Sequence, residues 1–175
     1  MEAVRILLAE DHGVLRHGLK RIIESYGPPV VIGEAVNGHH AVELAVGARP
    51  DVIIMDVGMP VLNGIESTAR ITALWPGARV LILSAHEELE TISGAFRAGA
   101  RGYILKSEAD EVLARAIAAV HEGSLYIGPA VAGVLLDSMS DGSRSARSEM
   151  PLLTFVEIRL LELIRRGFSD NSAAA

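Results

Sequence analysis

The chain has 175 residues, half of them apolar and 22% charged, which suits one globular domain of common size with a further fragment. Its formal net charge is −6 at pH 7, which argues against a broad basic surface for nucleic acid. No cysteine is present and no apolar run reaches the roughly 18 residues of a membrane-spanning helix, which excludes disulfides, thiolate chemistry and a membrane span.

Short apolar runs alternate five times with stretches of helical periodicity. The runs are apolar at consecutive positions, which is typical of parallel strands buried on both faces. This pattern predicts an α/β fold with a doubly wound, five-stranded parallel sheet, in which ligands bind beyond the carboxyl ends of the strands. We expect the strands at Val4–Ala9, Val30–Ala35, Asp51–Met55, Arg79–Ser84 and Gly102–Leu105. We expect the helices at Val14–Tyr26, His39–Arg49, Gly64–Leu74, Glu87–Ala98 and Glu108–His121.

The pattern changes after the fifth helix. Pro129–Met139 has the composition of one more apolar helix, and the Ser- and Gly-rich Ser138–Ser148 is typical of a flexible linker. Beyond it, Thr154 and Glu157 have the capping-box spacing of a helix start, but a single helix cannot bury its own apolar stripe. We therefore divide the chain into an α/β domain (1–122), an extra helix with a linker (123–152) and an incomplete all-α fragment (153–175).

Polar side chains follow four of the five predicted strands. Glu10 and Asp11 follow the first strand, Asp56 follows the third, Ser84 ends the fourth and Lys106 follows the fifth. Each of these residues alone is most often a helix cap or a solvated turn residue. Because the carboxyl ends of parallel strands meet at one edge of a sheet, we expect all five side chains to converge on one site.

The predicted cluster suits phosphoryl transfer. Crowded carboxylates repel each other, and Mg²⁺ relieves that repulsion because it prefers oxygen ligands and is usually held by one or two carboxylates plus a phosphate. Asp56 is the candidate nucleophile, since a carboxylate can take a phosphoryl group as an aspartyl-phosphate. Lys106 would neutralise charge on the transferring group, and Ser84 would donate its hydroxyl to a phosphoryl oxygen.

Four motifs carry a family resemblance: Leu7-Leu8-Ala9-Glu10-Asp11-His12, Asp56-Val57-Gly58-Met59-Pro60 with Asn63-Gly64, Ser84-Ala85-His86, and Gly99-Ala100-Arg101-Gly102-Tyr103-Ile104-Leu105-Lys106. Over roughly residues 3–122 the chain resembles the receiver domain of two-component response regulators. The resemblance implies a flavodoxin-like sheet of strand order 2-1-3-4-5 and a phosphorylation site at Asp56. It also implies that Glu10, Asp11, Asp56 and the backbone carbonyl of Gly58 hold Mg²⁺.

The same resemblance implies a conformational switch. Ser84 and Tyr103 stand where receivers keep a switch hydroxyl and a switch aromatic residue. A phosphoryl group adds about two negative charges and three acceptors, so Ser84 would move towards it and Tyr103 would turn into the vacated space. The expected partners are a cognate histidine kinase and, on phosphorylation, a second copy of the chain. The N-terminus lacks the basic segment of a signal peptide, so we expect a cytoplasmic protein without a membrane partner.

Leu152–Ser169 resembles the opening of a LuxR/NarL-type helix-turn-helix domain. Phe155 stands where a proline is usual, and only the first helix and the following turn are matched. The helix that would enter the DNA major groove is not matched. We therefore expect DNA binding only in the full-length protein.

Two other functions remain open at this point. A dehalogenase-type phosphatase also forms an aspartyl-phosphate, but it needs a second acid where this chain has Gly58. A degenerate receiver could act as a constitutive dimerisation module, although the intact acid, serine and lysine set argues against it. We expect no enzyme activity beyond the chain's own phosphoryl transfer and dephosphorylation.

The histidines are weaker candidates. His39 and His40 lack an evident third metal ligand, so we interpret them as a solvated helix start. His12 and His17 are interpreted as surface or cap residues. His86 lies two positions after Ser84, and we expect it to affect the access of hydrolytic water to the phosphoryl group.

Overall fold

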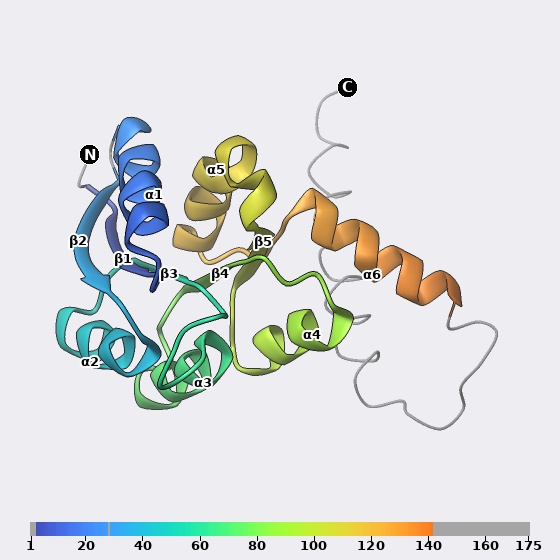
Figure 1. Ribbon diagram of the computed structural model, residues 1–175, viewed down its shortest axis with the longest axis horizontal. Coiled ribbons are helices and arrows are strands. Elements are labelled where there is room, and N and C mark those ends of the chain that lie inside the picture. The colour runs from blue at the N-terminus through green and yellow to red at the C-terminus, as the bar shows by residue number, and fades with distance from the viewer. Residues whose placement is uncertain (1–2, 28, 142–175) are drawn as a thin grey trace. The chain divides into compact units, whose positions relative to one another are not determined.

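The computed structural model describes residues 3–27 and 29–141. The predicted helix start at Thr154, the fragment 153–175 and the predicted linker beyond Asp141 lie outside the described residues. Strands and helices alternate through the described part of the chain (Figure 1). The elements are β1 Arg5–Ala9, α1 Gly13–Ser25, β2 Val30–Ala35, α2 Gly38–Ala48, β3 Val52–Met55, α3 Gly64–Leu74, β4 Val80–Ser84, α4 Leu89–Arg97, β5 Gly102–Leu105, η1 Lys106–Glu108, α5 Ala109–His121, β6 Tyr126–Ile127 and α6 Pro129–Asp141.

All strand pairs of the sheet are parallel, and the strand order is β2-β1-β3-β4-β5-β6. The predicted order 2-1-3-4-5 is confirmed, and the five predicted strands begin and end within one residue of their expected positions. The predicted total of five strands is corrected to six in the sheet of the described residues, because Tyr126–Ile127 adds a short strand beside β5. Two residues are too few to show a periodicity, so the sequence pattern does not reveal this strand.

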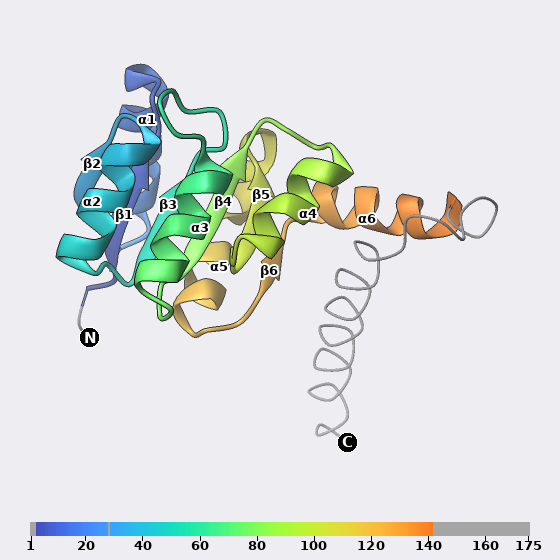
Figure 2. The ribbon, with the colours of Figure 1, turned by 90° about the horizontal axis from the view of Figure 1, so that it is seen from below.

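Helices cover both faces of the sheet. Helices α1 and α5 lie on one face, and α2, α3 and α4 lie on the other (Figures 1 and 2). Strand β3 is buried along its whole length, as the consecutive apolar pattern of Val52–Met55 predicts. The core between the sheet and the α1–α5 face includes Ile6 and Leu8 from β1, Ile54 from β3 and Leu113 from α5.

The predicted sixth helix is present and extends two residues further than expected, to Asp141. Its first turn is attached to β5. The backbone N–H of Gly128 donates to the carbonyl of Tyr103 at 2.8 Å, and the N–H of Ala130 donates to Oε2 of Glu108 at 3.1 Å. The other oxygen of Glu108 accepts from the N–H of Leu105 at 3.2 Å. The carboxylate of Glu108 therefore connects the end of β5 to the start of α6.

Candidate functional site

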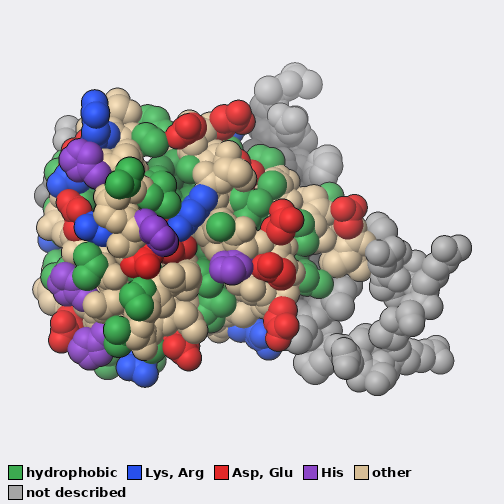
Figure 3. Space-filling model, in the orientation of Figure 1, with side chains coloured by type: hydrophobic (Ala, Val, Ile, Leu, Met, Phe, Trp, Pro, Cys, Tyr) green, Lys and Arg blue, Asp and Glu red, His purple; other side chains and the backbone are tan. Residues whose placement is uncertain are grey.

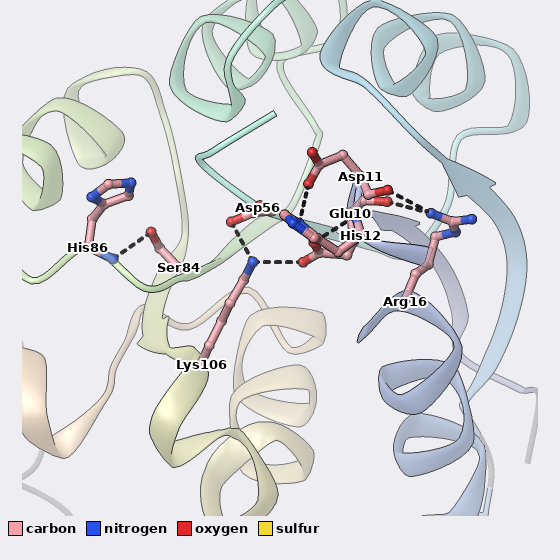
Figure 4. Close-up of polar contacts among 8 residues, drawn as sticks. All are labelled: Glu10, Asp11, His12, Arg16, Asp56, Ser84, His86 and Lys106. Atoms are coloured by element: carbon pink, nitrogen blue, oxygen red, sulfur yellow. Dashed lines mark hydrogen bonds and ion pairs between the residues drawn. The ribbon is translucent and has the colours of Figure 1, made fainter. Parts of the chain in front are cut away.

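The five side chains expected at the carboxyl edge of the sheet come from the positions that the sequence indicates. Glu10 and Asp11 follow β1, Asp56 follows β3, Ser84 ends β4, and Lys106 begins η1 directly after β5. Figure 4 shows Glu10, Asp56 and Lys106 pointing towards one another, with Asp11 beside them. On the face viewed in Figure 3, acidic, basic and histidine side chains meet near the middle of the α/β domain.

Sheet register explains why Glu10 and Asp56 are neighbours. Ala9 of β1 pairs with Met55 of β3, so the next residue of each strand emerges at the same level. The N–H of Asp56 donates to the carbonyl of Ala9 at 2.9 Å, which continues the ladder by one step. Both acidic side chains are almost completely buried, with exposed fractions of 1% for Glu10 and 6% for Asp56.

Lys106 contacts both members of this buried pair and offsets part of their charge. Its Nζ lies 2.8 Å from Oε2 of Glu10 and 3.0 Å from Oδ1 of Asp56. Burial by itself lowers the pKa of Lys106, but the hydrogen bonds and charges of Glu10 and Asp56 outweigh it, so the pKa is raised above its ordinary value. The ammonium is therefore charged at neutral pH. It lies where it could also contact an anionic group attached to Asp56.

Glu10 also belongs to a group of three neighbouring residues that could bind a metal ion. Glu10, Asp11 and His12 each offer one ligand atom, and these atoms lie within 4.8 Å of one another. Nδ1 of His12 is 2.9 Å from Oδ1 of Asp11, and the N–H of His12 donates to Oε1 of Glu10 at 3.1 Å. His12 is exposed and occupies the N-cap position of α1, as expected for a surface or cap residue. The contact of His12 with Glu10 and Asp11, which we call the acid pair, was not predicted from the sequence. The place of His12 directly after Asp11 in the sequence is a signal for this contact.

The carboxylate oxygens of the acid pair are suitable ligands for a hard divalent cation. Carboxylate oxygens are the ligands that Mg²⁺ prefers, and one or two of them usually suffice when a phosphate supplies another oxygen. Glu10 and Asp11 would hold such an ion beside Asp56. Gly58 is exposed, and a Cβ placed on it would lie 3.7 Å from Oδ2 of Asp56, so its backbone passes next to the same carboxylate.

The loop after β3 is held tightly around Asp56. The N–H of Gly64, the first residue of α3, donates to the carbonyl of Val57 at 3.0 Å, and Asn63 caps the helix through the N–H of Glu66. A Cβ at Gly64 would overlap the carbonyl oxygen of Asp56. The motif therefore requires glycine because two backbone segments approach closely here. Val61 in the same loop has φ of 70°, in the left-handed region that β-branched residues rarely adopt.

The two expected switch residues meet on the backbone of His86. Ser84 is fully buried, and its Oγ accepts a 3.0 Å hydrogen bond from the N–H of His86. Tyr103 is also fully buried and donates from its hydroxyl to the carbonyl of His86 at 2.7 Å. Burial raises the pKa of Tyr103, partly opposed by the Ser84 hydroxyl. The aromatic ring of Tyr103 is therefore already packed inwards in this conformation.

Among the described residues, His39 and His40 do not belong to a group of metal ligands. His39 is exposed, and its Nδ1 lies 3.7 Å from Glu43 on the next helical turn. His40 donates its N–H to the cap residue Asn37. In the part of the chain that the structure describes, Glu10, Asp11 and His12 form the only group of three or more such ligands. No helix within the described ranges is long and apolar enough to cross a bilayer.

The fold and the strand-end cluster define a class of protein: a doubly wound α/β domain with a cluster of acidic side chains at the carboxyl edge of its sheet. The response regulator receiver domain family matches residues 6–118. The chain therefore belongs to the response regulators, with a receiver domain as the matched part. This membership removes the dehalogenase-type phosphatase as an alternative.

Similar proteins narrow the type of response regulator. The transcriptional regulatory protein DegU of Brevibacillus brevis is 32% identical over 182 residues, which cover 96% of this chain and 77% of DegU. The nitrate/nitrite response regulator NarL of Escherichia coli K12 is 32% identical, covering 99% of this chain and 80% of NarL. A crystal structure of a LuxR-family response regulator from Aurantimonas superposes with a TM-score of 0.77 at 33% identity, covering 79% of this chain and 99% of that one. The chain is thus a two-component response regulator of the NarL and DegU type, a group that controls transcription.

Proposed function

We propose that Asp56 accepts a phosphoryl group from a histidine kinase in the presence of Mg²⁺. The observation that carries this proposal is the contact of one ammonium, that of Lys106, with both Asp56 and Glu10 at the carboxyl edge of the sheet. Two nearly buried carboxylates share one ammonium, so Lys106 compensates only one of their two negative charges, and such an arrangement favours a chemical role over a purely structural one. The carboxylate cluster also supports a cation site that comprises Glu10, Asp11, Asp56 and the carbonyl of Gly58.

The proposed transfer is a displacement at phosphorus. An oxygen of Asp56 forms the new P–O bond while the bond from phosphorus to a kinase imidazole nitrogen breaks, and the freed imidazole takes up a proton. In this proposal Lys106 would contact the transferring group and offset its charge, and Ser84 would supply a hydroxyl donor. When bound, Mg²⁺ would neutralise charge on the carboxylates and the phosphoryl oxygens. Hydrolysis of the acyl phosphate would return Asp56 to its carboxylate.

The proposed switch uses the shared contacts of Ser84 and Tyr103. A phosphoryl group on Asp56 would draw the Ser84 hydroxyl away from the N–H of His86. The carbonyl of His86 accepts the hydrogen bond of the Tyr103 hydroxyl, so a shift of His86 would also move or release that hydroxyl. This would alter the surface formed by α4, β5 and α5. We propose that a second copy of the chain docks there after phosphorylation.

The remaining roles follow from the family. We infer a cytoplasmic protein whose kinase partner supplies the phosphoryl group and whose own catalysis is limited to phosphoryl transfer and dephosphorylation. The division into residues 1–122, 123–152 and 153–175 stays a prediction. Support for a DNA-binding segment after the receiver comes from DegU and NarL, whose similarity extends over 96% and 99% of this chain. Specific DNA binding is expected of a chain with the complete helix-turn-helix domain.

Phosphoryl labelling tests the proposal. The protein is incubated with acetyl phosphate and Mg²⁺, and the acyl phosphate is measured by intact mass and by its lability to hydroxylamine. Asp56→Asn should abolish labelling, and EDTA should abolish it in the wild type. Asp51→Asn is a matched control, because Asp51 lies at the opposite end of β3, where its carboxylate accepts from the N–H of Arg5 at 2.8 Å. Labelling of Asp56→Asn at the wild-type stoichiometry would disprove the assignment.

Light scattering of the labelled protein tests the dimer. A mass that doubles on phosphorylation supports the switch, and a dimer of equal stability with and without the phosphoryl group would support a constitutive dimerisation module instead.

A further inference from the structure

Arg16 lies behind the acid pair, on the first helical turns of α1. Its Nη1 donates to the carbonyl oxygen of Glu10 at 2.8 Å and approaches that of Asp11 at 3.5 Å (Figure 4). The side chain is mostly buried, with an exposed fraction of 18%. One guanidinium therefore contacts the backbone of both acids that are candidates for holding a cation, without contacting either carboxylate group.

The other side of the guanidinium is fixed to β2. Nε of Arg16 donates to Oε2 of Glu34 at 3.1 Å, and Lys20 contacts the second oxygen of Glu34 at 2.9 Å. The hydrogen bond from Lys20, together with that from Arg16, lowers the pKa of Glu34, so its carboxylate stays charged. Next to Glu34, the carbonyl of Ala35 accepts from the N–H of Glu10 at 3.0 Å. The turn after β1 is thus attached to β2 twice, once through its backbone and once through Arg16.

We propose that Arg16 is a positioning residue that sets the affinity of the acid pair for a divalent cation. By holding the carbonyls of Glu10 and Asp11 towards α1 and β2, it leaves their carboxylates directed to the side of Asp56 and Lys106. Fixing the backbone before the ion arrives reduces the ordering that binding must otherwise impose. The inference rests on the proposed cation site and adds a residue to it that lies outside the four motifs quoted above.

A positioning role and a purely electrostatic role of Arg16 predict opposite effects of its removal on cation affinity. If Arg16 acted only through its positive charge, its removal would strengthen cation binding, because a repulsive charge near the site would be gone. If it positions the turn, its removal weakens binding. Lys20 is a matched control for charge, since it pairs with the same Glu34 but donates to no atom of the turn after β1.

Magnesium affinity of the full chain distinguishes these outcomes. Mg²⁺ is titrated into metal-free protein, and binding is followed by calorimetry and by backbone amide shifts of the turn. We expect Arg16→Met to raise the Kd by about tenfold, the low end of the loss seen when residues that orient metal ligands are replaced. Arg16→Lys keeps the charge but loses the planar fork, so it should show most of the same loss. Lys20→Met should bind Mg²⁺ as tightly as the wild type or slightly more tightly.

Three comparisons make the result decisive. Equal Kd values for Arg16→Lys and the wild type would overturn the positioning role. A Kd for Arg16→Met at or below that of Lys20→Met would overturn it as well. Asp11→Asn tests the cation site itself: if it leaves the Kd unchanged, the proposed site is wrong, whereas if only Asp11→Asn weakens binding, the site stands and the role of Arg16 falls. Should Arg16→Met prove unfolded by circular dichroism, Arg16→Lys carries the test with Glu34→Gln beside it, and wild-type affinity of Arg16→Lys would again overturn the inference.

Discussion

The hydroxyl of Tyr103 donates a 2.7 Å hydrogen bond to the carbonyl of His86, whose own N–H donates to Oγ of Ser84 at 3.0 Å. The last residue of β4 and an interior residue of β5 are thus joined through one residue of the loop after β4. Both side chains are fully buried, so the link lies inside the domain.

Replacing Tyr103 by Phe should lower the free energy of unfolding by about 1 kcal/mol, the usual contribution of one intramolecular hydrogen bond. The ring itself stays buried, so little packing is lost. Urea unfolding followed by circular dichroism measures the change. Tyr26→Phe is the control, because its hydroxyl reaches the carbonyl of Asp110 only at 3.5 Å, too far for a strong bond. Equal losses in the two variants would show that the His86 contact contributes nothing.

Replacing Lys106 by Met should lower the free energy of unfolding by about 3 kcal/mol at pH 7, since two nearly buried carboxylates lose their common partner. Phosphoryl labelling of Asp56 should fall as well. Lys20→Met, which removes an equal charge from a partly exposed pair, should have a much smaller effect on stability. Urea unfolding in EDTA provides the comparison without a contribution from metal. A Lys106→Met variant as stable as Lys20→Met would contradict the prediction.

The stability that Lys106 provides should depend on pH at the alkaline end. Its pKa in the folded protein is raised above the ordinary 10.5, so the folded state binds this proton more tightly than the unfolded state. The contribution is fully present below pH 10.5 and is lost as the pH rises through the folded pKa. The stability difference between wild type and Lys106→Met should therefore stay constant up to about pH 10 and shrink above it. A difference that grows with pH in that range would show the opposite sign.

Replacing Gly64 by any residue with a side chain should destabilise the protein. Gly64→Ala would place a Cβ against the carbonyl oxygen of Asp56 and 2.9 Å from Cα of Val57, where backbone must move. We expect a loss of about 3 kcal/mol, the upper end for overpacking. Gly18→Ala is the matched contrast, since nothing lies within 4 Å of its Cβ position in the middle of α1. It should raise stability by about 0.5 kcal/mol through helix propensity. Thermal unfolding of both variants tests the pair, and a stable Gly64→Ala protein would contradict the close approach.

Replacing Val61 by asparagine should stabilise the protein. Its φ of 70° is unfavourable for a β-branched residue, and its side chain is 84% exposed, so little packing would be lost. Asparagine tolerates the left-handed region, so Val61→Asn should raise the free energy of unfolding by about 1 kcal/mol. Val14→Asn changes another strongly exposed valine, at a helical position, and should give no gain. The same urea unfolding assay applies. A Val61→Asn protein less stable than the wild type would show that the backbone there is not strained.

Sequence periodicity predicted most of the fold because burial on both faces leaves a continuous apolar run in each of the five long strands. It also placed Glu10, Asp56 and Lys106 at strand ends, and the rule that parallel strands share a carboxyl edge was enough to bring them together. Strand β6 was not predicted because Tyr126–Ile127 is too short to show a periodic pattern. It forms only because Tyr126 and Gly128 donate to carbonyls of the chain around β5.

By itself, therefore, the sequence determined the order of strands and helices, the strand-end positions of the acids, serine and lysine, and the family that these motifs define. Tertiary structure alone decided which atoms meet: the pairing of Lys106 with Glu10, the inward packing of Tyr103 onto His86, and the link from Arg16 to Glu34, 18 residues away. Local periodicity records which side of an element faces the core. Contacts between side chains of different elements depend on sheet register and on how the helices pack against it, and neither is encoded within a short stretch of chain.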